Sequence, residues 1–128
     1  MRLLLDTHVF LWWILDSPEM SKVARALVSD GANSLFWSAA SSWEVSIKYA
    51  LGRLPLPDRP ERFIPAELSR NAVQPLAITD AHAFQAGRLP LHHRDPFDRM
   101  LVAQSRVEQL ALLSSDPLLK AYRVDLRW

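Results

Sequence analysis

The stretch RLLLDTHVFLWW, residues 2–13, decides the fold because it leads from a short apolar run directly into a helix. The run Arg2–Leu5 predicts a buried strand, and Asp6-Thr7 turn the chain into a helix that is apolar on nearly every side. Strands followed by helices are typical of parallel sheets in α/β proteins. Asp6 would then lie at the carboxyl end of a strand, where such sheets form their binding sites.

The alternation of strand and helix continues along the chain. Further strands are predicted at residues 34–39, 72–78 and 110–114, with a short fifth at 122–126. Helices are predicted at residues 9–15, 17–30, 43–51, 62–71, 79–87 and 97–109. Pro75 indicates an edge position for its strand, since proline cannot donate a hydrogen bond to a neighbouring strand. We therefore expect an α/β fold with a short parallel sheet of four to five strands and helices on both faces.

Two of these helices carry apolar stripes that we expect to face the core. In the helix over 43–51 the stripe consists of Trp43, Ile47, Ala50 and Leu51. In the helix over 97–109 it consists of Met100, Ala103, Val107 and Leu110. Residues three or four positions apart share one side of a helix, so each set predicts a single buried face.

Composition narrows the class of protein. A chain of 128 residues suits one domain, spanning residues 1–128, and 49% apolar residues argue against disorder. The net charge of +1 predicts no general attraction to nucleic acid, so such contacts would need a local basic patch. The absence of cysteine excludes disulfides and thiolate metal sites. Asp6 and His8 interrupt the apolar start, and no run reaches the ~18 apolar residues of a membrane span, so we expect a soluble, cytoplasmic protein without membrane contact.

Four carboxylates follow predicted strands or open the helices after them. They are Asp6, Glu44, Asp98 and Asp116. Because the carboxyl ends of parallel strands meet at one edge of a sheet, we expect these side chains to converge there. Like charges a few ångström apart raise one another's pKa, and a divalent cation relieves the repulsion. Oxygen ligands of this kind suit Mg²⁺ or Mn²⁺.

Each acid also has an ordinary structural explanation, and for Asp6 it is a cap of the helix that follows. Ser41-x-x-Glu44 matches a capping box, in which Glu44 satisfies a backbone N–H. Asp95-Pro96 matches a helix N-cap with proline in the first turn, which places Asp98 in that turn, and Asp116-Pro117 repeats the pattern. Taken singly, the last three acids favour capping. Taken together, their common place in the fold favours a site.

Four motifs, in this order, make a resemblance to a known family specific. They are LLLDTHVFLWW (3–13), SAASSWEVSIKYALGRLPLP (38–57), HHRDPFDRMLVAQS (92–105) and LLSSD (112–116). On these motifs the chain resembles PIN-domain ribonucleases of the VapC-like toxin group, from type II bacterial toxin–antitoxin pairs. The resemblance covers nearly the whole chain and implies a PIN-like three-layer sandwich.

The resemblance implies a metal-dependent endoribonuclease that hydrolyses RNA phosphodiester bonds with Mg²⁺ or Mn²⁺. The family's four catalytic, metal-binding acids match Asp6, Glu44, Asp98 and Asp116. Of these, Asp6 and Asp98 are the expected direct ligands. Thr7 and Ser114 match residues that support the acids without binding the ion. Asp95 could be a cap or a further ligand, and we favour the cap.

Contacts to the substrate and to protein partners are also expected. The loop before Asp98 gathers basic residues, which predict contacts to the RNA backbone. The candidates are His92, His93, Arg94 and Arg99. A solvated loop with surface ion pairs is the alternative. The resemblance further implies a homodimer and a cognate antitoxin protein.

Two other functions compete with this interpretation. A non-catalytic binding module of the same fold would use the acids only for capping and solubility. LLLDTHVF is also similar to the aspartyl-nucleophile motif of haloacid dehalogenase-like phosphatases, but His8 stands where that motif has its second aspartate, which removes the general acid. Loss of RNA cleavage in Asp6→Asn would separate the nuclease from the binding module, and an acyl phosphate on Asp6 would indicate the phosphatase.

Overall fold

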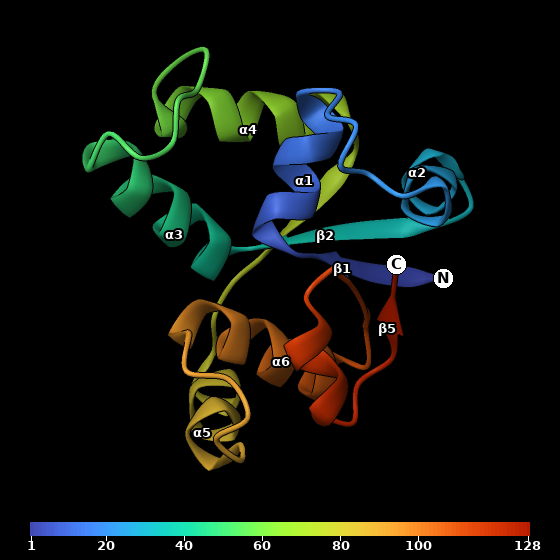
Figure 1. Cartoon of the computed structure of the whole chain (residues 1–128), viewed down its shortest axis with the longest axis vertical. Coiled ribbons are helices and arrows are strands. Elements are labelled where there is room, and N and C mark those ends of the chain that lie inside the picture. Colours follow the sequence, from blue (N-terminus) through green and yellow to red (C-terminus); the bar gives the residue numbers. More distant parts are fainter.

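The computed structural model describes all 128 residues and contains a five-stranded parallel sheet (Figure 1). Its strands run in the order β3-β2-β1-β4-β5. They are β1 (Arg2–Leu5), β2 (Ser34–Ser38), β3 (Val73–Leu76), β4 (Ala111–Leu113) and β5 (Leu126–Arg127). Every neighbouring pair is parallel, so the predicted α/β fold with a short parallel sheet is confirmed. β3 forms one edge, as Pro75 indicates.

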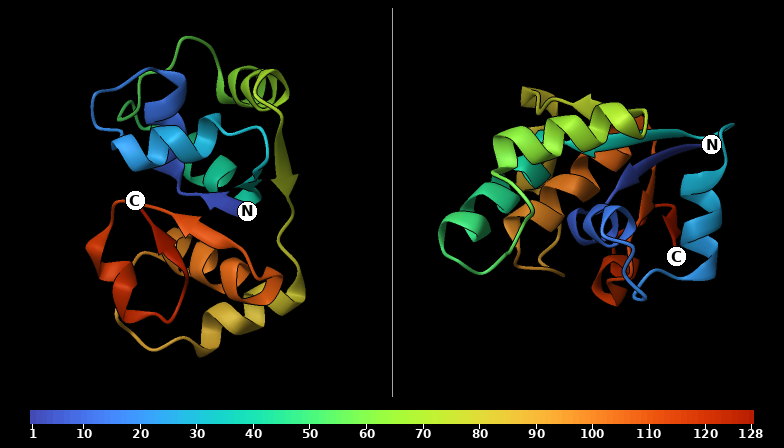
Figure 2. Two further views of the ribbon diagram at one scale, coloured as in Figure 1. Left: turned by 90° about the vertical axis from the view of Figure 1, so that its right-hand side faces the viewer. Right: turned by 90° about the horizontal axis from the view of Figure 1, so that it is seen from above.

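Helices cover both faces of the sheet (Figure 1 and Figure 2). On one face lie α1 (Thr7–Ile14), α2 (Lys22–Ser29), α3 (Ala39–Ala50) and α4 (Pro60–Arg70). On the other lie α5 (Asp80–Arg88), α6 (Pro96–Glu108) and the short 3₁₀ helix η1 (Pro117–Ala121). The expected three layers are therefore present. None of these helices combines the length and the apolar character that crossing a bilayer requires.

The sheet sends alternate side chains into two separate cores. Leu3 and Leu5 of β1 pack with Phe10 in one core, whereas Leu4 packs with Leu101 in the other. All three leucines of β1 are fully buried. Successive side chains of a strand point to opposite faces, so a continuous apolar run is what a strand covered on both sides requires. The register of β1 therefore fixes both cores and the position of the residue that follows.

Several helices begin at other residues than predicted, α1 at Thr7 instead of residue 9 and α3 at Ala39 instead of residue 43. α2 is capped by Ser21, whose Oγ accepts a hydrogen bond from the Ala24 N–H at 3.0 Å. The expected start at Ser17 is wrong, because Ser17 belongs to the turn before the helix. α4 begins at Pro60 rather than at residue 62, since proline lacks an N–H and fits the first turn of a helix.

The apolar stripes of two helices are more exposed than predicted. Their exposed members are Trp43, Ile47, Ala50, Leu51 and Val107. α3 instead turns Glu44 and Val45 inward, and α6 turns Leu101 and Ser105 inward. The predicted buried face of α3 is therefore wrong, because the side of this helix that meets the rest of the molecule carries polar residues of the site described below.

The ends of β1 and β4 lie side by side. The Asp6 N–H donates to the Leu113 carbonyl oxygen at 3.0 Å, which continues the β1–β4 pairing past the end of β1. Asp6 consequently lies next to Ser114, the residue that follows β4. This pairing gives the carboxyl end of the sheet a fixed geometry.

Candidate active site

The predicted acids converge at the carboxyl end of the sheet. Asp6 follows β1, Glu44 lies in α3 after β2, Asp98 lies in the first turn of α6, and Asp116 follows β4. Burial raises the pKa of Asp98, and the negative charges of Asp6 and Glu44 add to the rise, so both carboxylates lie within electrostatic range of Asp98. Asp116 shares one imidazole with Asp98. All four acids therefore border one site.

Buried hydroxyl groups hold the first acid in place. Ser114 Oγ donates to Asp6 Oδ2 at 2.6 Å, and both residues are almost fully buried. The same Oγ accepts from the Asp116 N–H at 3.1 Å, so one hydroxyl links the first and fourth acids. Thr7, next to Asp6, donates its hydroxyl to Ser41 Oγ at 2.7 Å and ties α1 to α3. Asp6 occupies the N-cap position of α1 but its side chain makes no capping hydrogen bond, so the capping explanation of Asp6 is wrong.

Burial disfavours the charged form of two acids. Burial raises the pKa of Asp6, an effect that the Ser114 hydrogen bond partly offsets and the charge of Glu44 increases. Burial also raises the pKa of Asp98 to about 7, and the charges of Asp6 and Asp95 add to this shift. A bound cation would reduce the free-energy cost of keeping these buried, neighbouring carboxylates negatively charged.

Glu44 is buried and already has a cation beside it. It is only 4% exposed, and Lys48, one turn later in α3, places Nζ 2.5 Å from Glu44 Oε2. The capping-box explanation of Glu44 is wrong, because α3 begins directly where β2 ends. Its N-cap is Ser38, whose Oγ accepts from the Ala40 N–H at 3.0 Å. Glu44 therefore lies further inside the helix, with no backbone group to cap.

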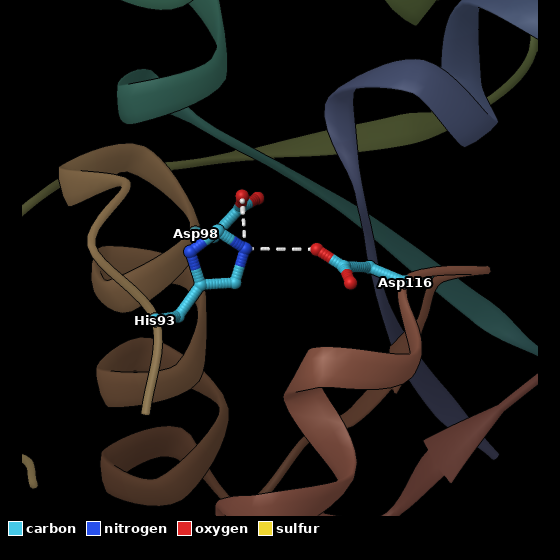
Figure 3. Close-up of side chains that lie close together, drawn as sticks. All are labelled: His93, Asp98 and Asp116. Carbon is cyan, nitrogen blue, oxygen red and sulfur yellow. Dashed lines mark hydrogen bonds and ion pairs between the residues drawn. The ribbon is translucent and has the colours of Figure 1, made fainter. Parts of the chain in front are cut away.

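His93 lies between the third and fourth acids (Figure 3). Its Nε2 is 3.2 Å from Asp98 Oδ2 and 2.9 Å from Asp116 Oδ2. Asp116 also caps η1 through Oδ1, so it combines the structural role with a place in the site. Asp95 accepts from the first backbone N–H groups of α6 and is the helix cap that the sequence predicts.

The basic residues of the loop before α6 differ in their availability. The Arg99 guanidinium donates to three backbone carbonyl oxygens at the end of α5 and just after it, at 2.9–3.0 Å. The His92 ring packs edge-on against Tyr122, and His93 contacts the acids. Arg94 is exposed and takes part in no ion pair. Of the four candidates for substrate contact, Arg94 is the one whose charge remains free.

The donor set suits a divalent cation. Ligand atoms of His93, Asp98 and Asp116 lie within 4.8 Å of one another, and Asp6 and Glu44 border the same space. Mg²⁺ and Mn²⁺ prefer carboxylate oxygens, and burial, with neighbouring negative charge as a smaller cause, already raises the pKa of Asp6 and of Asp98. The four acids are the residues that could hold such an ion.

Sequence patterns miss how the loop before α6 is held. They predict a substrate contact for His93 and give no role to Tyr122, whose hydroxyl accepts from the His92 N–H and the His93 N–H at 3.1 and 2.8 Å. Tyr122 follows η1, far along the chain from this loop, so no local spacing connects the two. The only feature of the sequence that indicates a contact between His93 and the acids is its closeness to Asp98.

Comparisons with known sequences give a family and one characterised relative. The sequence profile described as PIN domain matches residues 3–124 of the chain. Ribonuclease VapC16 of Mycobacterium tuberculosis (strain ATCC 25618 / H37Rv) is 43% identical over 58 residues, which cover 45% of this chain and 41% of that protein. The match therefore spans less than half of the relative's length.

Solved structures of toxin–antitoxin complexes are similar over nearly the whole chain. VapBC2 from Rickettsia felis, bound to a promoter DNA fragment, has a TM-score of 0.70 at 14% identity and covers 99% of this chain and 98% of the matched one. VapBC-1 from nontypeable Haemophilus influenzae has a TM-score of 0.65 at 19% identity, covering 100% and 96%. A toxin–antitoxin complex from Klebsiella pneumoniae has a TM-score of 0.65 at 14% identity, covering 98% and 96%. At such identities the likeness shows a common fold.

Proposed function

The chain belongs to the PIN-domain family, and on that premise we propose that it is a divalent-cation-dependent endoribonuclease and the toxin of a toxin–antitoxin pair. The observation that carries the proposal is the meeting of four acids at the carboxyl end of the sheet. A partial relative named as a ribonuclease supports the reaction, and structural neighbours that are toxin–antitoxin complexes support the biological role.

The acids have different tasks in this proposal. Asp6 and Asp98 are the direct ligands of Mg²⁺ or Mn²⁺, because burial and mutual repulsion make their charges the least favourable without a cation. Asp116 completes the set. Glu44 already forms an ion pair with Lys48, so it is the acid least available for direct contact with the ion. When bound, the ion supplies positive charge to the scissile phosphate and lowers the pKa of a water molecule.

The remaining residues of the site support this chemistry. Ser114 fixes the orientation of the Asp6 carboxylate and of the Asp116 backbone, and Thr7 fixes the start of α1 against α3. The exposed Arg94 beside the site is placed to contact the RNA backbone, since a guanidinium can bind a phosphate through two parallel hydrogen bonds. The partial relative named as a ribonuclease supports RNA as the substrate, cut at its phosphodiester bonds.

The proposed partners follow from the same family. They are a cognate antitoxin protein and a second copy of the chain, as a homodimer. The neighbouring structures of toxin–antitoxin complexes support the antitoxin. Residues 1–128 would form one domain that acts in the cytoplasm.

Cleavage of labelled RNA tests the proposed function. Wild-type protein is expected to cut RNA with Mg²⁺ or Mn²⁺ and to stop when the ion is chelated. Asp6→Asn keeps the size of the side chain but removes the charge, and it is expected to lose more than about 100-fold in rate. The matched control is Asp80→Asn, because Asp80 is an exposed acid in the first turn of α5, outside the site.

Two outcomes would contradict the proposal. Equal cleavage by wild type and Asp6→Asn would indicate a contaminating nuclease or another site. The absence of cleavage by wild type, on single-stranded and structured RNA alike, would favour the non-catalytic binding module.

A further inference from the structure

One side-chain atom contacts two of the four acids. His93 Nε2 lies 3.2 Å from Asp98 Oδ2 and 2.9 Å from Asp116 Oδ2 (Figure 3). The His93 side chain is 13% exposed, and those of the two acids are 18% and 27% exposed. The contact with Asp116 is a hydrogen bond, and Asp98 Oδ2 lies within ion-pair distance of the same nitrogen.

The hydrogen bond of the other ring nitrogen shows that Nε2 is the donor in its own hydrogen bond. His93 Nδ1 accepts from the Asp95 backbone N–H at 3.1 Å. A nitrogen that accepts carries no hydrogen, so the hydrogen of the ring sits on Nε2, where it faces Asp116. If Nε2 were to ligate a cation, this hydrogen would have to move to Nδ1, where it would collide with the Asp95 N–H. The geometry therefore opposes ligation and favours donation.

The loop that carries His93 is fastened from the side away from the acids. The Tyr122 hydroxyl accepts from the His93 N–H at 2.8 Å and donates to the Pro90 carbonyl oxygen at 2.9 Å. Arg99 donates to the same hydroxyl at 3.2 Å and to the same carbonyl oxygen at 2.9 Å. The imidazole is consequently held by contacts that do not involve the acids. It can orient the acids instead of being oriented by them.

We propose that His93 is a positioning residue, whose Nε2–H donates to Asp116 and lies beside Asp98, and which aligns both carboxylates for a divalent cation without binding the cation itself. The inference rests on the proposed function, because it assumes that the four acids hold such an ion. Side chains that orient metal ligands in this way typically contribute about 10- to 100-fold to metal affinity.

Titration of the full chain with Mn²⁺, followed by electron paramagnetic resonance, tests the proposal. His93→Leu removes the donor and is expected to weaken Mn²⁺ binding about 10-fold or more. His93→Gln carries an amide N–H near the position of Nε2 and is expected to bind Mn²⁺ close to wild type. The matched control is Leu91→Ala, in the same loop, because Leu91 is 73% exposed and its replacement reports a general loosening of the loop.

A second readout does not depend on the variants of His93. Pulsed electron paramagnetic resonance of the Mn²⁺-loaded wild type is expected to show no directly bonded histidine nitrogen. His8 also lies within electrostatic range of Asp6, so a directly bonded histidine nitrogen that persists in His8→Ala would make His93 a ligand and overturn the proposal. Equal Mn²⁺ affinity of wild type and His93→Leu would overturn it as well. Failure of the wild type to bind Mn²⁺ at all would instead overturn the proposed function, and the positioning role with it.

Discussion

The two halves of the acidic site are built differently. Asp6 and Glu44, the enclosed pair, are 6% and 4% exposed, and each has a partner of its own, a serine hydroxyl for one and a lysine ammonium for the other. Asp98 and Asp116, the shared pair, have side chains that are 18% and 27% exposed and depend on a single imidazole. The difference teaches that the enclosed pair is fixed by the fold itself, whereas the shared pair is positioned by a loop.

The largest effect is expected from breaking the enclosed pair at Ser114. Ser114→Ala removes the hydrogen bond to the buried Asp6 carboxylate and leaves the Asp116 N–H without its acceptor. We expect the free energy of unfolding to fall by about 3 kcal/mol, measured by chemical denaturation without metal. Ser115→Ala is the matched control, since Ser115 is exposed. If both replacements lowered the free energy of unfolding equally, the hydrogen bond from Ser114 to the buried Asp6 carboxylate would not be what stabilises this part of the site.

A smaller effect, of opposite sign, is expected from the shared pair. The pKa of Asp98 is about 7 in the folded protein against 3.8 for the ordinary group, so the folded state binds more protons between these values. Stability without metal therefore falls as the pH rises from about 4 to about 7. Asp98→Asn removes this penalty and is expected to raise the free energy of unfolding by about 2 kcal/mol at pH 8, with little change at pH 4.

Thermal melts of Asp98→Asn in a chelator, at pH 4 and pH 8, measure this difference. Asp80→Asn serves as the control, because Asp80 also lies in the first turn of a helix but is exposed. A lower melting temperature of Asp98→Asn at pH 8 would mean that the favourable position of Asp98 at the start of α6 outweighs its burial.

A third, weaker effect concerns the ammonium group in the enclosed pair. Lys48→Met leaves the Glu44 carboxylate buried without its cation, while the methionine stem keeps most of the packing. Lys48 is 37% exposed, so solvent screens the pair, and we expect a loss of only about 1 kcal/mol in the free energy of unfolding. The exposed Lys22 gives the control Lys22→Met. If Lys48→Met were as stable as that control, Glu44 would not depend on its partner.

The smallest effect is expected on substrate binding, from Arg94, the exposed basic residue next to the shared pair. Arg94→Ala removes one exposed guanidinium beside the site and is expected to raise the KM for RNA about threefold with little change in kcat. Salt should reduce the difference, because exposed charges are screened. Arg106→Ala, at the other end of α6, is the control, and a similar rise in KM there would show that the effect is not local.

The centre of the fold follows directly from the sequence. The runs LLL (residues 3–5) and ALL (residues 111–113) are apolar without interruption, which only a strand covered on both faces tolerates, and both lie in inner strands of the sheet. The convergence of the acids follows from the same runs, because each acid comes after a strand or opens the next helix. Exposed apolar residues are harder to foresee, since Trp43 and Ile47 have helical spacing whether their face is buried or not.

The finer structure of the site depends on contacts that spacing cannot reveal. The pattern Ser41-x-x-Glu44 fits a capping box and a helix interior equally well, because it does not specify where the helix begins. His92 and His93 are adjacent and chemically identical, yet only His93 reaches the acids. The Tyr122 hydroxyl holds the backbone of both residues, but the His92 ring packs against the Tyr122 ring, whereas the His93 ring turns to the acids.

The pleat of β1 also constrains how this protein can change in length. Its leucines alternate between two cores, and the next residue, Asp6, completes the pairing with Leu113. Inserting or deleting one residue in this strand would exchange the faces of all its side chains and displace Asp6 from Ser114. The connection over residues 51–59 has no such requirement. Descendants of this chain should therefore gain or lose residues in that connection, while β1 evolves by substitution alone.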